Sequence, residues 1–204
     1  DGADAQITFL DGELDDAGML DTPVFWEHTL YTAGDVKNYV CTAEEDQTQP
    51  CPICESGDKP SLVQVFTIID HRPHTIQRGP NAGKVIQHSI KLLVAKPGTR
   101  KLLAKIASKR GGLTGCTFDV SRTGDKSPAV GDQFDFVTKA TSYEEIAAKY
   151  DLPVDLVKAA DYDEEIRYIE PEELIKAGVG KAPTGVGYQK TGTGFNKTQL
   201  ADQL

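Results

Sequence analysis

One histidine and three cysteines within residues 26–57 constrain the fold of this chain more than any other feature. Their spacing is His28-x12-Cys41-x9-Cys51-x2-Cys54. A C-x2-C pair places two thiolates on one tight turn, and a histidine with a third cysteine completes the four ligands of a tetrahedral zinc ion. Because protein side chains would take all four positions, the spacing predicts a closed, structural Zn²⁺ site.

The segments around these residues predict a hairpin followed by a loop. Residues 23–31, PVFWEHTLY, alternate between apolar and polar side chains as a strand does, and residues 36–40, VKNYV, form a second short strand. Cys51 and Cys54 lie between two loop-like stretches, DQTQP and ESGDKP. We therefore expect a zinc-binding hairpin and knuckle inserted at about residues 24–60.

Two other interpretations of the C-x2-C pair remain open. A redox or disulfide pair is one, although a thioredoxin-type pair opens a helix in a βαβ unit, and here both flanks are loops. A zinc nucleobase deaminase is the other, since such enzymes carry P-C-x-x-C after an H-x-E motif. Thr29 and Leu30 follow His28, however, and Cys41 would fill the position of the catalytic water. The fourth cysteine, Cys116, is expected to be a buried core thiol.

Charge is distributed unevenly along a chain whose net charge is −9. Residues 1–60 hold 2 basic and 14 acidic side chains, and residues 127–204 hold 8 basic and 14 acidic ones. Residues 61–126, in contrast, hold 12 basic and 3 acidic side chains. This basic middle third favours a polyanionic partner despite the acidic total.

The rest of the first 140 residues reads as short strands with one helix. The stretch 97–112, PGTRKLLAKIASKRGG, predicts a helix between the third and fourth core strands, with Pro97 and Gly98 before it and Gly111 and Gly112 after it. This order favours a mainly β fold, an OB-fold barrel over residues 1–140 into which the zinc hairpin is inserted. A small β-sandwich is the competing fold.

The ligand spacing resembles that of the single-stranded DNA-binding proteins of T-even bacteriophages. The stretches AQITFL, SLVQV, GKVIQHSIK, RKLLAKI, GCTFDV and GDQFDFVTK are similar to core elements of that family, so the resemblance covers roughly residues 5–140. It implies a phage-encoded, zinc-containing OB-fold protein that protects single-stranded DNA during replication, recombination and repair. It also implies the cytoplasm of the host cell as its location.

Single-strand binders need cations along the phosphates and flat rings for the bases. The loop 71–84, HRPHTIQRGPNAGK, supplies cations without an intervening acid, and no helix carries base-reading side chains. Binding should therefore be sequence-tolerant and sensitive to salt. The candidate DNA-contacting residues are Trp26, Tyr39, Phe66, His71, Arg72, His74, Arg78, Lys84, His88, Lys91, Arg122, Phe134 and Phe136.

The last third predicts helices and then a tail. Residues 141–178 form a helical appendage expected to pack on the barrel, beginning with a capping box of Ser142 and Glu145. Part of it resembles a helix-turn-helix, but its acidic charge disfavours a duplex reader. Residues 178–194 hold six glycines, so residues 179–204 are predicted to be a flexible tail that contacts replication proteins or another copy of the chain.

No catalytic triad, phosphate loop or fixed pair of carboxylates is evident, so we do not expect an enzyme. No signal peptide is visible, and no apolar run approaches the ~20 residues of a membrane helix, which predicts a soluble protein without a membrane partner. The main alternative to DNA binding is a zinc-ribbon module that contacts proteins of a replication or transcription complex.

Overall fold

The computed structural model describes residues 4–32, 35–45, 49–124 and 130–181. The chain divides into two compact units. The larger unit is formed by Asp1–Pro23 together with Gln64–Ala160, and the smaller unit by Val24–Val63 together with Asp161–Leu204. The four predicted zinc ligands lie in the smaller unit, and the basic side chains of residues 61–126 lie in the larger one.

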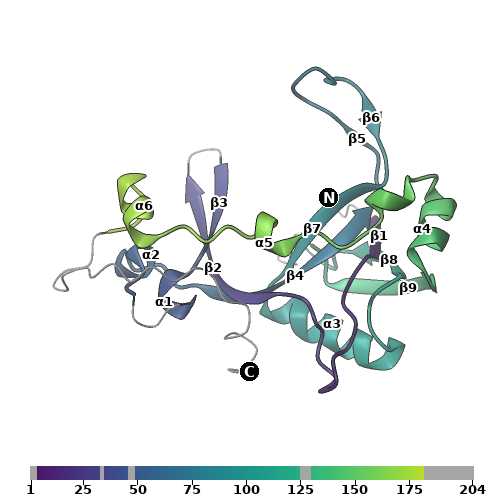
Figure 1. The fold of residues 1–204 in the computed structure, drawn as a ribbon, viewed down its shortest axis with the longest axis horizontal. Coiled ribbons are helices and arrows are strands. Elements are labelled where there is room, and N and C mark those ends of the chain that lie inside the picture. The colour runs from purple at the N-terminus through teal and green to yellow at the C-terminus, as the bar shows by residue number, and fades with distance from the viewer. Residues whose placement is uncertain (1–3, 33–34, 46–48, 125–129, 182–204) are drawn as a thin grey trace. The chain divides into compact units, whose positions relative to one another are not determined.

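Seven antiparallel strands form the main sheet, in the order β3-β2-β4-β1-β8-β9, with β7 also paired to β4 (Figure 1). The strands of this sheet are β1 (Ala5–Phe9), β2 (Val24–Thr32), β3 (Asp35–Val40), β4 (Ser61–Asp70), β7 (Ser89–Ala95), β8 (Cys116–Ser121) and β9 (Gln133–Lys139). Within the described residues β9 has β8 as its partner in the strand order, so the sheet is not closed into a barrel. A mainly β fold is thus confirmed.

Strand β4 is central because apolar and small polar residues fill both of its faces. Its residues from Val63 to Asp70 are all buried, since Phe66 and Ile68 pack in one apolar cluster and Ile69, on the opposite face, packs in another. In the core, the Phe9 ring packs edge-on against Phe66, with ring centroids 5.6 Å apart, and against Phe118 at 5.8 Å. Such edge-to-face contacts stabilise a core beyond the area that they bury.

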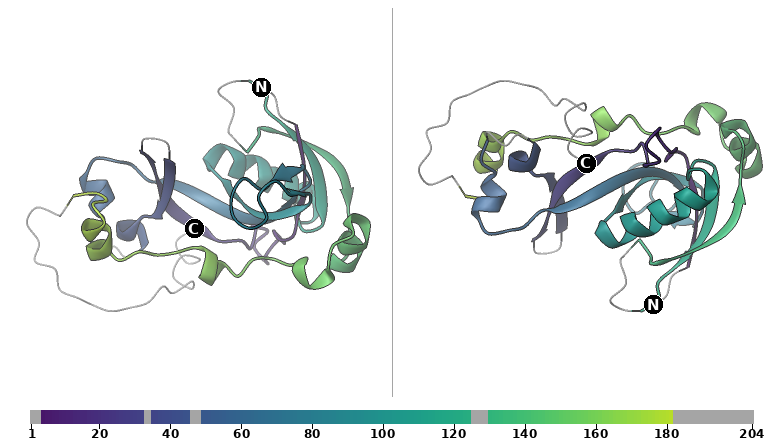
Figure 2. Two further views of the ribbon diagram at one scale, coloured as in Figure 1. Left: turned by 90° about the horizontal axis from the view of Figure 1, so that it is seen from above. Right: turned by 90° about the horizontal axis from the view of Figure 1, so that it is seen from below.

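Helix α3 (Pro97–Arg110) lies across the strands of the larger unit, as the right-hand view of Figure 2 shows. Pro97 at its first turn and Gly111, left-handed at φ 65°, set its ends. Leu103 and Ala107 are its buried residues that join the core of the larger unit. The predicted helix is confirmed with these bounds.

The helices of the last third pack within different units. In the larger unit α4 (Tyr143–Tyr150) begins at Ser142, whose side chain accepts from the Glu145 backbone N–H, and buries Ile146 against a cluster with Leu10. A short 3-10 turn follows at Val154–Leu156. In the smaller unit lie α5 (Tyr162–Glu165) and α6 (Pro171–Lys176). The expected single appendage is therefore split between the two units.

Residues 84–95 form two separate strands and not one continuous strand. A two-stranded hairpin of β5 (His74–Thr75) and β6 (Val85–Ile86) ends before His88. His88 has φ 55°, an uncommon value outside glycine, and β7 begins at the next residue. The left-handed residue turns the chain from the hairpin into the main sheet. The predicted tail falls mostly in residues 182–204, outside the described residues.

Two short helices flank the cysteines of the smaller unit, α1 (Thr42–Glu45) and α2 (Pro52–Glu55). Across the described residues, the helices are too short or too polar to span a bilayer.

Candidate metal centre and basic arm

The four predicted metal ligands come from three neighbouring segments of the smaller unit. His28 lies in β2, and Cys41 follows the last residue of β3. The backbone N–H of Cys41 donates to the carbonyl of Trp26 at 2.8 Å, which anchors the end of the hairpin. Cys51 is the N-cap residue of α2, and Cys54 lies within this helix. The pairing of β2 with β3 and the single turn of α2 thus bring all four side chains together.

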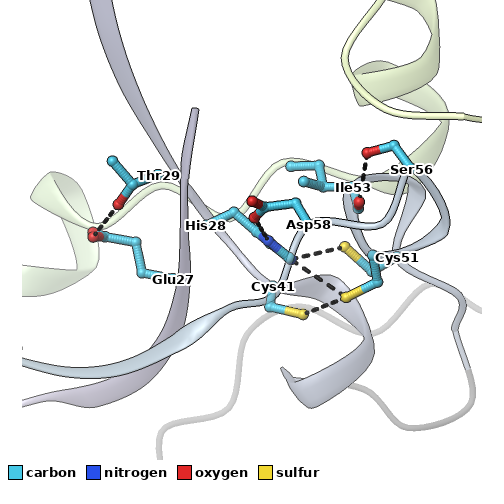
Figure 3. Close-up of polar contacts among 9 residues, drawn as sticks. Glu27, His28, Thr29, Cys41, Cys51, Ile53, Ser56 and Asp58 are labelled. Atoms are coloured by element: carbon cyan, nitrogen blue, oxygen red, sulfur yellow. Dashed lines mark hydrogen bonds and ion pairs between the residues drawn. The ribbon is translucent and has the colours of Figure 1, made fainter. Parts of the chain in front are cut away.

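The donor atoms of His28, Cys41, Cys51 and Cys54 all lie within 4.8 Å of one another. The Nε2 atom of His28 is 3.5 Å from the sulfur of Cys51 and 3.4 Å from that of Cys54, and the sulfurs of Cys41 and Cys54 are 3.6 Å apart. Figure 3 shows the imidazole pointing at the thiols. One nitrogen and three sulfurs therefore form a group that can hold a metal ion.

Burial and mutual hydrogen bonds separate the pKa values of the three thiols. The hydrogen bond from Cys41 lowers the pKa of Cys51 to about 2, and it raises the pKa of Cys41 itself. Burial raises the pKa of Cys54 to about 11. The Cys51 thiolate is thus stabilised by hydrogen bonds from its neighbours in the cluster. A bound cation would replace the protons of those hydrogen bonds.

Asp58 holds the other side of the histidine ring, and sequence reasoning missed it. Its carboxylate oxygen lies 2.6 Å from Nδ1 of His28 (Figure 3). Although burial works against protonation, hydrogen bonds to Cys51 and Asp58 raise the pKa of His28. With Nδ1 bonded to a carboxylate, Nε2 faces the sulfurs, the arrangement seen for metal-binding histidines. The acid four positions after Cys54 was the only signal in the sequence.

The cysteine loop has a small apolar core of its own. Cys41, Cys51, Ile53 and Leu174 are buried together, so α6 covers the loop within the smaller unit. The backbone N–H of Lys181 adds a hydrogen bond to the carbonyl of Pro52 at 2.8 Å. The candidate metal centre is therefore fixed by packing from both ends of the unit's sequence.

The predicted cations of loop 71–84 stand on a protruding arm, defined here as residues 71–88 (Figure 1). The hairpin of β5 and β6 is closed by tight backbone hydrogen bonds, such as that from the N–H of Ile76 to the carbonyl of Lys84 at 2.9 Å. His74, Arg78 and Lys84 are exposed along it. The arm thus presents positive charge to solvent, with no acidic residue between residues 71 and 91.

Asp70 organises the two cations at the base of the arm. It is 2% exposed, and its carboxylate accepts from the Arg72 guanidinium at 3.0 and 2.8 Å and from Nζ of Lys91 at 2.8 Å. Burial alone would raise its pKa, but the hydrogen bonds from Arg72 and Lys91 hold the pKa of Asp70 well below its ordinary value. Both cations are thereby held in place while half-exposed.

His71 and His88 meet at the base of the same arm. Their Nδ1 atoms are 2.8 Å apart, and Nε2 of His71 lies 2.8 Å from the hydroxyl of Thr8. The ring of Tyr150 stacks on His71 at a centroid distance of 4.0 Å. Burial, followed by the charges of His88 and Lys149, lowers the pKa of His71 to about 4. These two candidate DNA contacts are engaged with each other in this structure.

The predicted aromatic contacts are scattered. Phe66 is 0% exposed in the core, so the prediction that it contacts DNA is wrong, because β4 has no solvent-facing side at that position. Phe134 and Phe136 both pack edge-on against Phe118, and Phe136 lies under the Arg110 guanidinium at 3.7 Å. The remaining candidates are Trp26 and Tyr39, which pack partly buried in the smaller unit, and Arg122, half-buried at the end of β8.

No protein-family model matches the chain, and a search of curated proteins likewise gives no match. The function is therefore inferred from the two features above, the histidine–cysteine cluster and the basic arm.

Proposed function

We propose that this protein binds single-stranded DNA without sequence preference and carries a structural zinc ion, as the T-even phage proteins that its ligand spacing resembles do. The observation that carries the DNA-binding proposal is the arm 71–88. It combines exposed cations with a complete lack of acids, in a chain whose net charge is −9. A role in replication, recombination or repair of phage DNA follows from the same resemblance.

The donor geometry supports zinc as the metal. A tetrahedron with bonds of about 2.3 Å to sulfur and about 2.0–2.1 Å to nitrogen has edges of about 3.8 Å between sulfurs and about 3.6 Å between nitrogen and sulfur. The observed separations are 3.6 Å for one pair of sulfurs and 3.4 and 3.5 Å for nitrogen and sulfur. Four protein donors leave no position for a reactive water, which favours a structural ion over deaminase chemistry.

The strand order supports an OB-type core. Strand β1 pairs with both β4 and β8, β4 with β7, and β8 with β9, while α3 lies between β7 and β8 in the sequence. These pairings agree with the strand order of an OB-fold, a five-stranded, partly open Greek-key barrel that binds oligonucleotides, although the sheet is not closed here. The arm takes the place of the loop between its second and third strands.

Electrostatics support single strands as the partner. Basic side chains that contact the phosphates of a flexible single strand give sequence-tolerant binding, and this binding weakens steeply as the salt concentration rises. Helix α4, in the stretch that resembles a helix-turn-helix, holds Glu144 and Glu145 in its first turn, and this negative charge disfavours a reader of the duplex major groove. That stretch is thus poorly suited to binding a duplex.

A salt titration with a fluorescent oligothymidylate of ~20 nucleotides tests the proposal, with a duplex of equal length as competitor. We expect tight single-strand binding, weak duplex binding and a log–log salt slope that becomes shallower by about one per cation removed. Arg78→Ala on the arm is the test variant. Lys176→Ala, an exposed cation of α6 in the smaller unit, is its charge-matched control. Absence of binding at low salt would discard the proposal.

One observation favours the alternative of a protein-binding zinc module. Tyr31 and Val36, paired across β2 and β3, are 77% and 54% exposed. An exposed aromatic and a β-branched side chain next to an edge strand suit a protein contact. Capture of a partner that Tyr31→Ser abolishes, without any DNA binding by the parent protein, would favour this function.

A further inference from the structure

A groove in the larger unit has an apolar floor and a charged rim. It encloses about 200 Å³ and is lined by side chains from β1, β4, β7 and β8. Ile7, Ile68, Leu93 and Val120 form its floor, and each is only 4 to 6% exposed. A floor made of four branched aliphatic side chains favours a flat or apolar ligand over a hydrated one.

The rim of the same groove is cationic. Arg72 and Lys91 line it, and both are fixed by the buried carboxylate of Asp70. These three side chains together carry one net positive charge. Their exposed halves can therefore attract an anion at the groove edge, while Asp70 keeps them from collapsing onto the floor.

We infer that this groove is a subsite for one nucleotide of a single strand, with the base on the aliphatic floor and the adjacent phosphate on Arg72 and Lys91. The inference rests on the proposed function and names the place where a base is held. The volume is below the roughly 300–1,000 Å³ of pockets for drug-sized ligands, which suits a single ring system. A phosphate then lies beside the outer edge of the Arg72 guanidinium, since Asp70 already accepts from Nε and Nη2 on the inner edge.

The groove also explains how a base is held where stacking rings are sparse. Phe66 is buried, Phe134 is half-buried, and Phe136, which is 36% exposed, has the Arg110 guanidinium over its ring. Aliphatic contact then replaces aromatic stacking as the source of base affinity in the larger unit. The wall of the groove includes Leu92, an apolar side chain that is 37% exposed, which an unbound protein gains nothing by presenting to water.

Strand β7 offers a matched pair of variants for the test. Leu92 lines the groove, whereas Ile90, two residues earlier and 40% exposed, does not. We would measure binding of Leu92→Ala and Ile90→Ala to a ~6-nucleotide oligothymidylate and to an abasic oligomer with the same number of phosphates. Melting curves check that each variant is folded, and Ala5→Leu, which narrows the groove from β1, is a second test variant.

The parent protein should bind the thymidylate about tenfold more tightly than the abasic oligomer, the effect of one well-held base. Leu92→Ala and Ala5→Leu should reduce this ratio severalfold and leave abasic binding unchanged, while Ile90→Ala keeps the parent ratio. A ratio near one in the parent, or a ratio that neither groove variant changes, would overturn the subsite and leave DNA binding intact. Failure of the parent to bind either oligomer would instead remove the proposed function.

Discussion

Replacing Asp58 with asparagine tests the candidate metal centre at its least obvious member. The carboxylate of Asp58 accepts a hydrogen bond from Nδ1 of His28 at 2.6 Å, and this contact turns Nε2 toward the sulfurs of Cys51 and Cys54. Asparagine keeps the shape of the side chain but removes its charge. The ring then keeps at most a neutral amide oxygen as acceptor and loses the carboxylate charge that raises its basicity as a ligand.

The size of the effect follows from the exposure of the carboxylate. Mutation of such a hydrogen-bond partner of a ligating histidine typically weakens metal binding by about 10–100-fold. The Asp58 side chain is 36% exposed, so solvent screens part of its interaction. We therefore expect the lower end of this range, about tenfold, which corresponds to about 1.4 kcal/mol.

Competition with a chromogenic zinc chelator at neutral pH measures this change directly. Glu55→Gln is the matched control, because it removes the same charge from an exposed position at the end of α2. Equal zinc affinity in Asp58→Asn and the parent protein would refute the reasoning. Equal weakening in both variants would show that net charge, and not the hydrogen bond to His28, determines the affinity.

Three further changes probe the two sites. Cys54→Ser should lose zinc and lower the melting temperature by several degrees in calorimetry, whereas Cys116→Ser, remote in sequence from the cluster, should keep one zinc per chain. Asp70→Asn should cost about 1–3 kcal/mol in urea unfolding, because Arg72 and Lys91 lose the negative charge that pairs them but can regain water. Because the folded pKa of His71 is lowered to about 4, its neutral form favours the folded state. That stability should be present above about pH 6.5 and lost toward pH 4. His71→Gln should flatten this part of a melting-temperature profile, with His74→Gln as control.

The metal cluster could be predicted from the sequence because its chemistry is local. Ligand spacing and alternating strands place His28 and Cys41 on one hairpin whatever the rest of the fold does, and the C-x2-C turn brings Cys51 and Cys54 to them. Asp58 could not be predicted in the same way. Many acids lie near the cysteines, and only the folded turn selects the one that meets the imidazole.

The error at Phe66 has a different physical cause. Alternation along a strand identifies an outward side only when one face of the sheet is solvated. Strand β4 is flanked by β1 and β7 and buries its residues from Val63 to Asp70 on both faces, so no ring on it points outward there. Whether the sheet closes into a barrel could likewise not be predicted from the sequence. A second partner for β9 depends on the curvature of the sheet, which the local pattern of side chains does not encode.

Both sites share one design that the net charge of the chain conceals. At the cluster, Asp58 orients a histidine toward the sulfurs, and in the groove the buried Asp70 fixes Arg72 and Lys91 at the rim. In each case a single carboxylate positions basic side chains, and the contact with them offsets much of the negative charge of the carboxylate. The arm and the groove rim therefore stay cationic in an acidic chain, because Asp70, the acid at their base, is buried and paired with Arg72 and Lys91.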